Sequence, residues 1–151
     1  MKCLSVSQPF ADLIISGKKT IELRTWNTNF RGEFLVHSPI KMRTEDCKRL
    51  KITKKLKTGV IIGKAEIYDV KSYENAKEIK SDQTFHFASK NFQKKIYGFM
   101  LKNAKALRVP IPWKGQLGFF DVDLQKQKHS YKKLITGIID EEYRYQWIGH
   151  H

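Results

Sequence analysis

The sequence is poor in cysteine and proline, the residues that staple or interrupt a small domain. Of its 151 residues, two are cysteines, Cys3 and Cys47, and four are prolines. The cysteines form no C-x-x-C pair, which argues against a disulfide scaffold and against a thiolate zinc site. None of the five histidines stands at metal-ligand spacing. We therefore expect no metal and no cofactor, and we expect a reducing, cytoplasmic setting.

Long hydrophobic runs are absent as well. No apolar stretch reaches the length of about 18 residues that a membrane-spanning helix needs. The chain becomes polar at Ser7 and Gln8, too early for a signal peptide. The hydrophobic content of 40% is nevertheless too high for a disordered chain. One domain over residues 1–151 is predicted, without repeats or linkers, and no membrane partner is expected.

Acidic residues are scarce relative to basic ones. Lysine and arginine number 29 against 15 aspartate and glutamate residues, which gives a net charge of +14. Such a charge on a small protein raises the local concentration of polyanions, and this favours RNA, DNA or a nucleotide as the partner. A solvated lysine-rich surface with no nucleic-acid role is the alternative.

Hydrophobic periodicity predicts short strands with helices between them. Strand patterns occur at residues 3–7, 20–24, 32–38, 59–70 (with Gly63 as a bulge), 97–101 and 117–124. Helical spacing begins after a cap at Ser7 or Gln8 and ends at Gly17, and further helices are expected at 44–51, within 72–92 and at about 130–146. Two prolines make 108–113 an extended edge or loop. The predicted fold class is α+β, a mixed β-barrel of five or six strands over about 3–124 with flanking short helices.

The segment 17–24 carries the most chemistry. Period 2 places Glu22 and Arg24 on one face of a strand, about 7 Å apart, with apolar side chains on the other face. Lys19 precedes the strand, and the pattern does not fix its direction. A surface salt-bridge ladder is one interpretation. A polar site is the other, in which a charged Lys19 with Arg24 suits phosphate or carbonyl binding better than base catalysis.

Residues on either side of this segment add what an unpaired base requires. Gln8 lies at a strand-to-helix junction, and Trp26 follows the strand with amide side chains behind it. An aromatic face, amides and cations together fit a flipped-out base. Glu22 could accept a hydrogen bond from an exocyclic amine of that base. A core position for Trp26 is the alternative.

A second basic region lies between residues 41 and 57. It is interpreted as a track for the phosphate backbone that leads toward the site, or alternatively as a solvated basic helix and loop. The region contains two acidic residues, Glu45 and Asp46. Its basic residues are Lys41, Arg43, Lys48, Arg49, Lys51, Lys54, Lys55 and Lys57.

Taken together, these residues resemble the ASCH family, a branch of the PUA-like barrel superfamily. The family hallmark G-x-K-x-x-E-x-R is met by Gly17, Lys19, Glu22 and Arg24. Further segments are similar to the family pattern in the same order: L-S-V-S-Q-P-F-A from residue 4, R-G-E-F-L-V-H from residue 31, the strand at 59–70, and V-P-I-P-W-K-G from residue 109 with G-F-F from residue 118. The resemblance spans residues 3–123.

The resemblance implies a PUA-like barrel with a cleft that the hallmark residues line, and RNA binding linked to translation or transcription. Lys114, in the last similar segment, is then expected to contact the cleft. Some small members of the family are hydrolases. One kind is an amidohydrolase that deacetylates N4-acetylcytidine with a lysine, a threonine and a glutamate. Lys19 matches its lysine, whereas Glu22 stands in the place of the threonine. Another kind is a ribonuclease that uses tyrosine, lysine and serine.

Three functions follow as hypotheses. The first is an RNA- or nucleotide-binding domain whose contacts are Gln8, Lys19, Glu22, Arg24, Trp26 and Lys114. The second is a hydrolase that acts on acylated cytidine or RNA, with Lys19 and Glu22 as its catalytic residues. The third is a protein-interaction domain that docks a partner on a helix at 131–143, for which packing on the barrel is the alternative role. The sequence does not indicate an oligomeric state.

Overall fold

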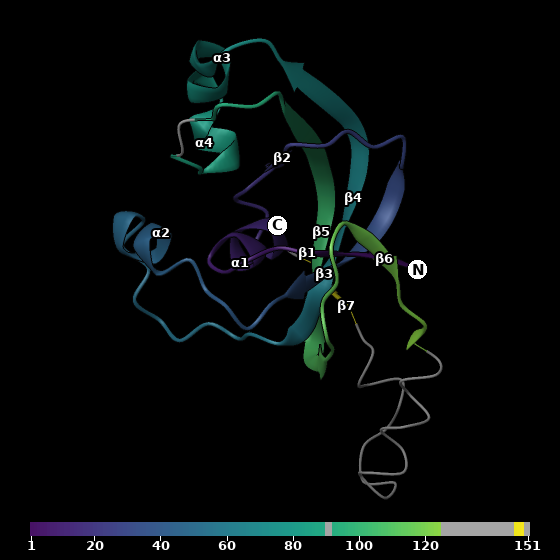
Figure 1. The fold of residues 1–151 in the computed structure, drawn as a ribbon. Coiled ribbons are helices and arrows are strands. Elements are labelled where there is room, and N and C mark those ends of the chain that lie inside the picture. Colours follow the sequence, from purple (N-terminus) through teal and green to yellow (C-terminus); the bar gives the residue numbers. More distant parts are fainter. Residues whose placement is uncertain (90–91, 125–146, 150–151) are drawn as a thin grey trace, which may run out of the picture.

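The computed structural model describes residues 1–89 and 92–124, together with the backbone of 147–149. The helix expected at 130–146, and with it the docking face at 131–143, lies outside the described residues. Within the described part, a curved sheet forms the body of the domain and four short helices gather toward one side of it (Figure 1). The predicted α+β class is confirmed.

Six strands form the hydrogen-bonded path of the sheet, in the order β2-β5-β4-β3-β1-β6, and β7 pairs with β5 off this path. Their bounds are β1 Lys2–Ser5, β2 Ile21–Arg24, β3 Gly32–Ser38, β4 Val60–Tyr73, β5 Ile96–Pro112, β6 Phe119–Asp121 and β7 Trp147–Gly149. The described pairs are antiparallel except for β1 with β3, which run parallel, so the sheet is mixed as predicted. Among the described strands no pair joins the two ends, β2 and β6, so hydrogen bonds do not close the sheet into a full barrel.

The two longest strands, β4 and β5, bend together. Register shifts interrupt their pairing at three places, one of them between Ile61 and Gly63. Irregularities of this kind bend a strand and increase its twist. The bulge predicted at Gly63 is confirmed. A Cβ at that position would stand 2.3 Å from the carbonyl oxygen of Lys105, so the close approach of the two strands requires glycine.

The strand β5 corrects one expectation. The pattern predicted a strand at 97–101 and a separate edge or loop at 108–113, but one strand runs from Ile96 to Pro112. The prolines do not interrupt it, because the residues between Ala106 and Ile111 have no registered partner in β4. Pro110 therefore removes no ladder hydrogen bond to β4, and Pro112 ends the strand. The strand expected at 117–124 is also shorter than predicted, since β6 has three residues.

Four helices connect the strands in the described part: α1 Phe10–Ile15, α2 Thr44–Arg49, α3 Ala76–Ser81 and α4 Gln83–His86. The first begins at Phe10 with Pro9 as its N-cap, slightly later than the predicted cap at Ser7 or Gln8. The Gln8 side-chain oxygen nevertheless accepts a hydrogen bond from the Asp12 amide at 2.9 Å and satisfies a free N–H of the first turn. Gly17, at φ +82°, follows the helix in a backbone conformation that favours glycine. The chain then turns directly into β2.

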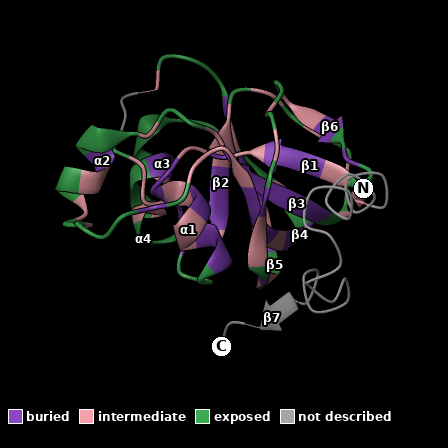
Figure 2. Ribbon diagram, turned by 90° about the horizontal axis from the view of Figure 1, so that it is seen from below, coloured by how far each residue is buried: buried purple, intermediate pink, exposed green. Residues whose placement is uncertain are grey.

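Buried residues are concentrated in the central strands (Figure 2). Leu4 and Val36 belong to the main core, which α1 covers, whereas Cys3 and Leu35 belong to a second cluster. Neighbouring residues of β1 and β3 thus alternate between two cores, as expected for a parallel pair that is buried on both faces. Packing around the main core places the end of β1, the start of α1 and β2 next to one another.

Candidate functional site

A cavity of about 380 Å³ opens beside the predicted motif. Its wall comes from four segments: the junction of β1 and α1, the chain around β2, α2, and the chain between α4 and β5. Four of the six predicted contact residues lie together in this wall: Lys19, Glu22, Arg24 and Trp26. The structure therefore brings the three charged hallmark residues and the tryptophan into one hollow.

The Lys19 ammonium group is buried and has three acceptors close to its nitrogen. The side chain is 2% exposed. The ammonium group donates to the backbone carbonyls of Ile21 and His86, both at 2.6 Å, and lies 3.2 Å from Glu22 Oε1. Three acceptors thus match the three donors of an ammonium group. The ring of Phe10, whose centre lies 5.2 Å from Nζ, adds a cation–π contact.

Glu22 is shared between two cations. Its Oε1 faces Lys19, while Oε2 accepts from Arg24 Nε at 2.9 Å and lies 2.8 Å from Arg24 Nη2. Arg24 Nη2 also donates to the carbonyl oxygen of Ser5 at 2.8 Å, which ties β2 to the end of β1. Glu22 and Arg24 lie on one side of the strand as predicted. A surface ladder does not describe them, because the Glu22 side chain is only 10% exposed.

Burial and charge oppose each other in this cluster. Burial raises the pKa of Glu22, but the Lys19 ammonium and the Arg24 guanidinium outweigh it and hold the pKa below its ordinary value. Burial lowers the pKa of Lys19, and Glu22 opposes that shift. Since each donor of Lys19 has an acceptor within 3.2 Å, the geometry fits the ammonium form. The cluster then carries one net positive charge beside the cavity.

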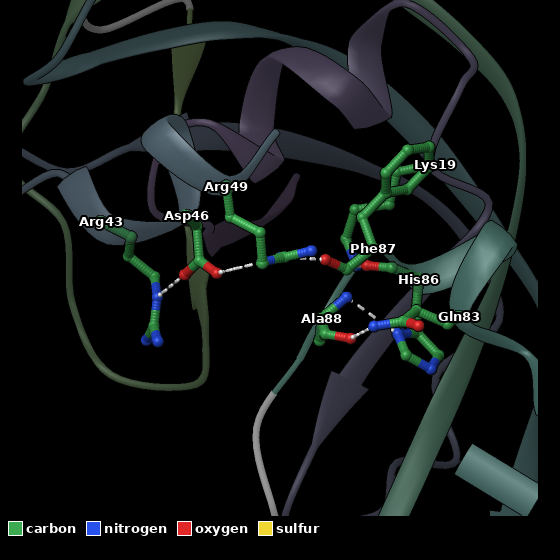
Figure 3. A network of polar contacts seen from close by, with 8 residues as sticks. All are labelled: Lys19, Arg43, Asp46, Arg49, Gln83, His86, Phe87 and Ala88. Atoms are coloured by element: carbon green, nitrogen blue, oxygen red, sulfur yellow. Dashed lines mark hydrogen bonds and ion pairs between the residues drawn. The ribbon is translucent and has the colours of Figure 1, made fainter. Parts of the chain in front are cut away.

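The chain that ends α4 supplies the carbonyl that holds Lys19 (Figure 3). His86 Nε2 lies 2.6 Å from the Ile79 carbonyl oxygen, and the Ala88 amide donates to Nδ1 at 2.9 Å. These two bonds fit a neutral ring that carries its hydrogen on Nε2. Burial lowers the pKa of His86, and the Lys19 charge adds to this shift. The imidazole thereby fixes the turn that presents the His86 carbonyl.

The helix α2 forms another part of the wall, with an acid between two arginines (Figure 3). Asp46 accepts from Arg43 Nε at 2.7 Å and from Arg49 Nη2 at 3.0 Å. Burial raises the pKa of Asp46, but hydrogen bonds from the two arginines outweigh it and lower the pKa. Arg49 also donates to the Phe87 carbonyl and so links α2 to the chain after α4. Arg43 lines the cavity with 40% of its side chain exposed.

Aromatic side chains contribute flat apolar surface to the same hollow. Phe10, Trp26 and Phe92 are among its lining residues. The Trp26 ring meets Phe99 edge-on at 5.2 Å and Phe119 at 5.7 Å. Trp26 therefore packs against the core and also lines the cavity.

Two predicted contact residues lie elsewhere. Gln8 is fully buried, and its amide nitrogen donates to Asp12 Oδ1 at 2.8 Å and to the Lys57 carbonyl at 3.0 Å. It therefore joins the start of α1 to the chain that enters β4. Lys114 is exposed and is not among the described residues that line the cavity.

The predicted phosphate track is divided between separate places, although all eight of its basic residues are exposed. Arg43 lines the cavity and Arg49 contacts the Phe87 carbonyl. Three lysines border a second cavity: Lys54, Lys55 and Lys57. The others line neither hollow in the described part: Lys41, Lys48 and Lys51.

A serine and a histidine form a buried link next to the cavity. His37 Nε2 lies 2.7 Å from the Trp113 carbonyl oxygen, and Nδ1 lies 2.9 Å from Ser5 Oγ. Burial lowers the pKa of His37, which fits a neutral ring that donates to Trp113 and accepts from Ser5. A Cβ on Gly115 would stand 2.5 Å from Ser5 Oγ, so glycine lets this part of the chain cover the hydroxyl. The pair joins β1, β3 and the chain after β5.

Some wall residues escaped the sequence reasoning. Ala88, Ser89 and Phe92 lie within 72–92, where the hydrophobic pattern was ambiguous. Asp46 entered the sequence argument only as a charge that opposes the basic region, whereas it organises two arginines. Its position three residues from each arginine, on one helix face, was the available signal.

Neither a metal cluster nor a membrane span occurs among the described residues. No three histidine, cysteine, aspartate or glutamate side chains there are grouped so that they could hold a metal ion. No helix of that part is long and apolar enough to cross a membrane.

Comparison with known proteins identifies the family. The ASCH domain matches residues 4–136 of this chain. The chain belongs to the ASCH domain family. Activating signal cointegrator 1 from Homo sapiens is 29% identical to it over 119 residues, which cover 66% of this chain and 20% of that protein. The Mus musculus protein of the same name is 28% identical with the same coverage. The chain thus spans about a fifth of the length of these curated relatives.

A solved structure agrees with the family assignment. The ASCH protein from Zymomonas mobilis superposes with a TM-score of 0.61 at 15% identity, and the match covers 88% of this chain and 94% of that chain. A serine-to-alanine variant of the same Zymomonas mobilis protein gives a TM-score of 0.60 at 16% identity, with the same coverage. These similarities show the fold, and the predicted ASCH, PUA-like α+β architecture is confirmed.

Within this ASCH domain the hallmark residues differ in what they offer a ligand. Lys19 and Glu22 are buried and bound to each other, whereas Arg24 is 21% exposed. Arg24 is therefore the hallmark side chain with surface available at the cavity, and the other two hold it in position.

Proposed function

We propose that this ASCH domain binds RNA, through a nucleotide unit that enters the cavity, and that it acts in the regulation of translation or transcription. The observation that carries the proposal is the meeting of Arg24 and Arg43 with Trp26, Phe10 and Phe92 in one hollow. Guanidinium groups offer planar donors to phosphates and base edges. Aromatic faces stack on unpaired bases.

Charge and family membership support the same ligand. The net charge of +14 favours a polyanion over a neutral ligand. ASCH domains are associated with RNA, and this chain belongs to that family. In this proposal Lys114 adds exposed positive charge from outside the cavity, and Gln8 positions the backbone rather than touching the ligand.

Glu22 and Lys19 act as positioning residues in this proposal. Glu22 holds the Arg24 guanidinium by two contacts, and Lys19 neutralises the second oxygen of Glu22. A carboxylate oxygen can accept more than one hydrogen bond, so Glu22 keeps the capacity to accept from an exocyclic amine.

The geometry favours binding over base catalysis by Lys19. A general base needs a free lone pair directed at the substrate. The donors of Lys19 are instead directed at two backbone carbonyls and a carboxylate, and the side chain is 2% exposed. A lysine held in this way would have to lose a proton and give up at least one of these partners before it could accept a proton from a substrate.

We also propose a single domain over residues 1–151 and a cytoplasmic location. Cys3 and Cys47 are both free. Burial raises the pKa of Cys3 to about 12, which keeps its sulfur as an unreactive thiol. Free thiols persist in reducing compartments, and this supports the location.

Fluorescence anisotropy with a labelled, mixed-sequence single-stranded RNA tests the proposed function. Affinity should fall as salt rises, with a log–log slope of about −0.7 for each phosphate contact. Arg24→Ala should weaken binding by about tenfold or more, because charge-assisted contacts to phosphate or base are lost. The matched control is Arg31→Ala, since Arg31 is exposed and lines neither cavity.

Two outcomes would overturn the proposal. One is equal binding by the Arg24 and Arg31 variants at low salt. The other is release of cytidine from N4-acetylcytidine, or cleavage of the RNA, that disappears in Lys19→Ala. The second result would make the domain a hydrolase.

A further inference from the structure

A second cavity, of about 610 Å³, borders a different face of α1 from the first. The helix contributes Asp12, Leu13 and Ile15 to it, whereas Phe10 faces the first cavity. Further parts of the wall come from the chain after α1, from the chain between α2 and β4, from the second half of β5 and from Phe87. No residue of the ASCH hallmark is among its described lining residues.

Positive charge dominates the lining of this cavity. Five basic residues stand against one acid, Asp12, and they are Lys18, Lys54, Lys55, Lys57 and Arg108. Lys54 lies 3.7 Å from Asp12 Oδ2 and is 71% exposed, so the acid offsets one of the five charges. Lys18, Lys55 and Lys57 form no ion pair with any residue that the structure describes. The basic residues that line this cavity, here called its rim, therefore favour an anionic ligand.

The floor between these cations is apolar. Leu13, Ile62 and Leu107 are among its lining residues. A small inorganic anion would leave this surface uncovered, whereas a nucleotide carries both a charged phosphate and a flat, weakly polar base. Pockets for such ligands combine an apolar lining with a few convergent polar groups.

The two cavities are neighbours along the chain at three points, one of them between Lys18, which lines the second cavity, and Lys19, which lines the first. Pro9 lines the second and Phe10 the first, and Phe87 lines the second while Ala88 lines the first. At each of these points, two residues joined by one peptide bond line different cavities. Gln8 supports the wall between the cavities, because hydrogen bonds of its side-chain amide join the start of α1 to the Lys57 carbonyl.

We propose that the second cavity is a subsite for an adjacent nucleotide of the same single RNA strand, with the phosphates placed along Lys55 and Lys57. The inference rests on the proposed function of the first cavity and extends it. A single strand is required because the faces of bases in a duplex are covered by stacking on their neighbours and could not contact the apolar floor. The domain then reads two neighbouring unstacked nucleotides, one on each side of the start of α1.

The test compares ligands of different length on matched variants. Lys55→Ala with Lys57→Ala removes two charges from the rim and leaves the Lys57 carbonyl in place. Lys77→Ala with Lys80→Ala is the control, since both lysines are exposed on α3, which lies away from the chain between α2 and β4 (Figure 1). Each protein is titrated with a mononucleotide and with single-stranded RNA of about eight residues, a length within the range of known single-strand sites.

We expect the Lys55/Lys57 variant to bind the oligonucleotide about tenfold more weakly than the control, and its salt slope to fall by about 1.4, the contribution of two phosphate contacts. Its affinity for the mononucleotide should stay unchanged. Equal weakening in the two lysine pairs would overturn the subsite. So would an affinity that does not rise from mononucleotide to oligonucleotide, or an acidic peptide that binds the rim more tightly than RNA does.

The Arg24→Ala variant separates the two proposals. If it alone weakens mononucleotide binding, the first cavity binds a nucleotide whatever the rim lysines do. If oligonucleotide binding depends on Lys55 and Lys57 but not on Arg24, the subsite stands and the proposed function of the first cavity fails.

Discussion

Two charge clusters border the first cavity, and each places one carboxylate between two cations. The strand cluster is Lys19, Glu22 and Arg24, and the helix cluster is Arg43, Asp46 and Arg49. Their carboxylates are almost equally buried, at 10% and 11% exposed. The cations differ, since those of the strand cluster are 2% and 21% exposed and those of the helix cluster 40% and 31%.

The difference in exposure gives the clusters different mechanical roles. A cation that has lost its water cannot turn away from its partner without a large penalty, so the strand cluster is a rigid scaffold. A half-exposed arginine keeps part of its hydration and can exchange a carboxylate for a ligand phosphate at little cost. We therefore expect the helix cluster to adapt to a ligand, and the strand cluster to keep its arrangement.

Glu22→Gln should produce the largest loss of stability. Lys19 would stay buried with a neutral partner, and breaking a buried pair in this way costs about 3–5 kcal/mol. Urea denaturation followed by tryptophan fluorescence measures the change. The control Glu66→Gln removes an acid that lies 3.7 Å from Lys102 and should cost under about 1 kcal/mol. Equal losses in the two variants would contradict a rigid strand cluster.

Asp46→Asn should cost less, about 1 kcal/mol in the same experiment, because both arginines keep access to water when the charge is removed. RNA affinity should rise slightly, since Arg43 is released toward the cavity. A loss as large as that of Glu22→Gln would show that the two clusters do not differ as their exposure suggests.

Acid should weaken the connection between the clusters through His86. The pKa of His86 is lowered in the folded state, so the folded protein binds a proton less readily than the unfolded chain does. Stability is then complete above the ordinary pKa of 6.5 and is lost as the pH falls through the folded-state value. Titration of the imidazole by NMR measures this directly, and an apparent pKa at or above 6.5 for His86 would refute it.

Arg49→Ala should have the smallest effect on global stability, below about 1 kcal/mol. Its effect should be local, because Arg49 joins α2 to the Phe87 carbonyl. Hydrogen exchange of the Ala88 amide, which is bonded to His86 Nδ1, should become faster. Unchanged exchange would mean that the chain after α4 holds its position without α2.

The strand cluster was largely predictable from the sequence. Period 2 placed Glu22 and Arg24 on one side of a strand, and their contact at 2.9 Å agrees. The burial of Glu22 was not predictable, because it depends on a distant chain segment that covers the same side of β2. The direction of Lys19 was undetermined for the same reason, since it is set by the His86 carbonyl, 67 residues away.

Backbone acceptors leave no trace in a residue pattern, and this explains most of what the sequence analysis missed. The residues 72–92 gave an ambiguous pattern because α3 and α4 are short, with six and four residues. Gln8 shows the opposite case: its residue type suggested a ligand contact, while its amide is occupied by Asp12 and the Lys57 carbonyl.

The two carbonyls that hold Lys19 have a consequence for divergence within the family. Every amino acid carries a carbonyl oxygen, so substitutions at positions 21 and 86 can change the side chains there without removing either acceptor. The position of the Lys19 ammonium group therefore depends on the path of the backbone rather than on the side chains at positions 21 and 86. Distant relatives can therefore keep this lysine in the same environment while sharing almost none of the residues that surround it.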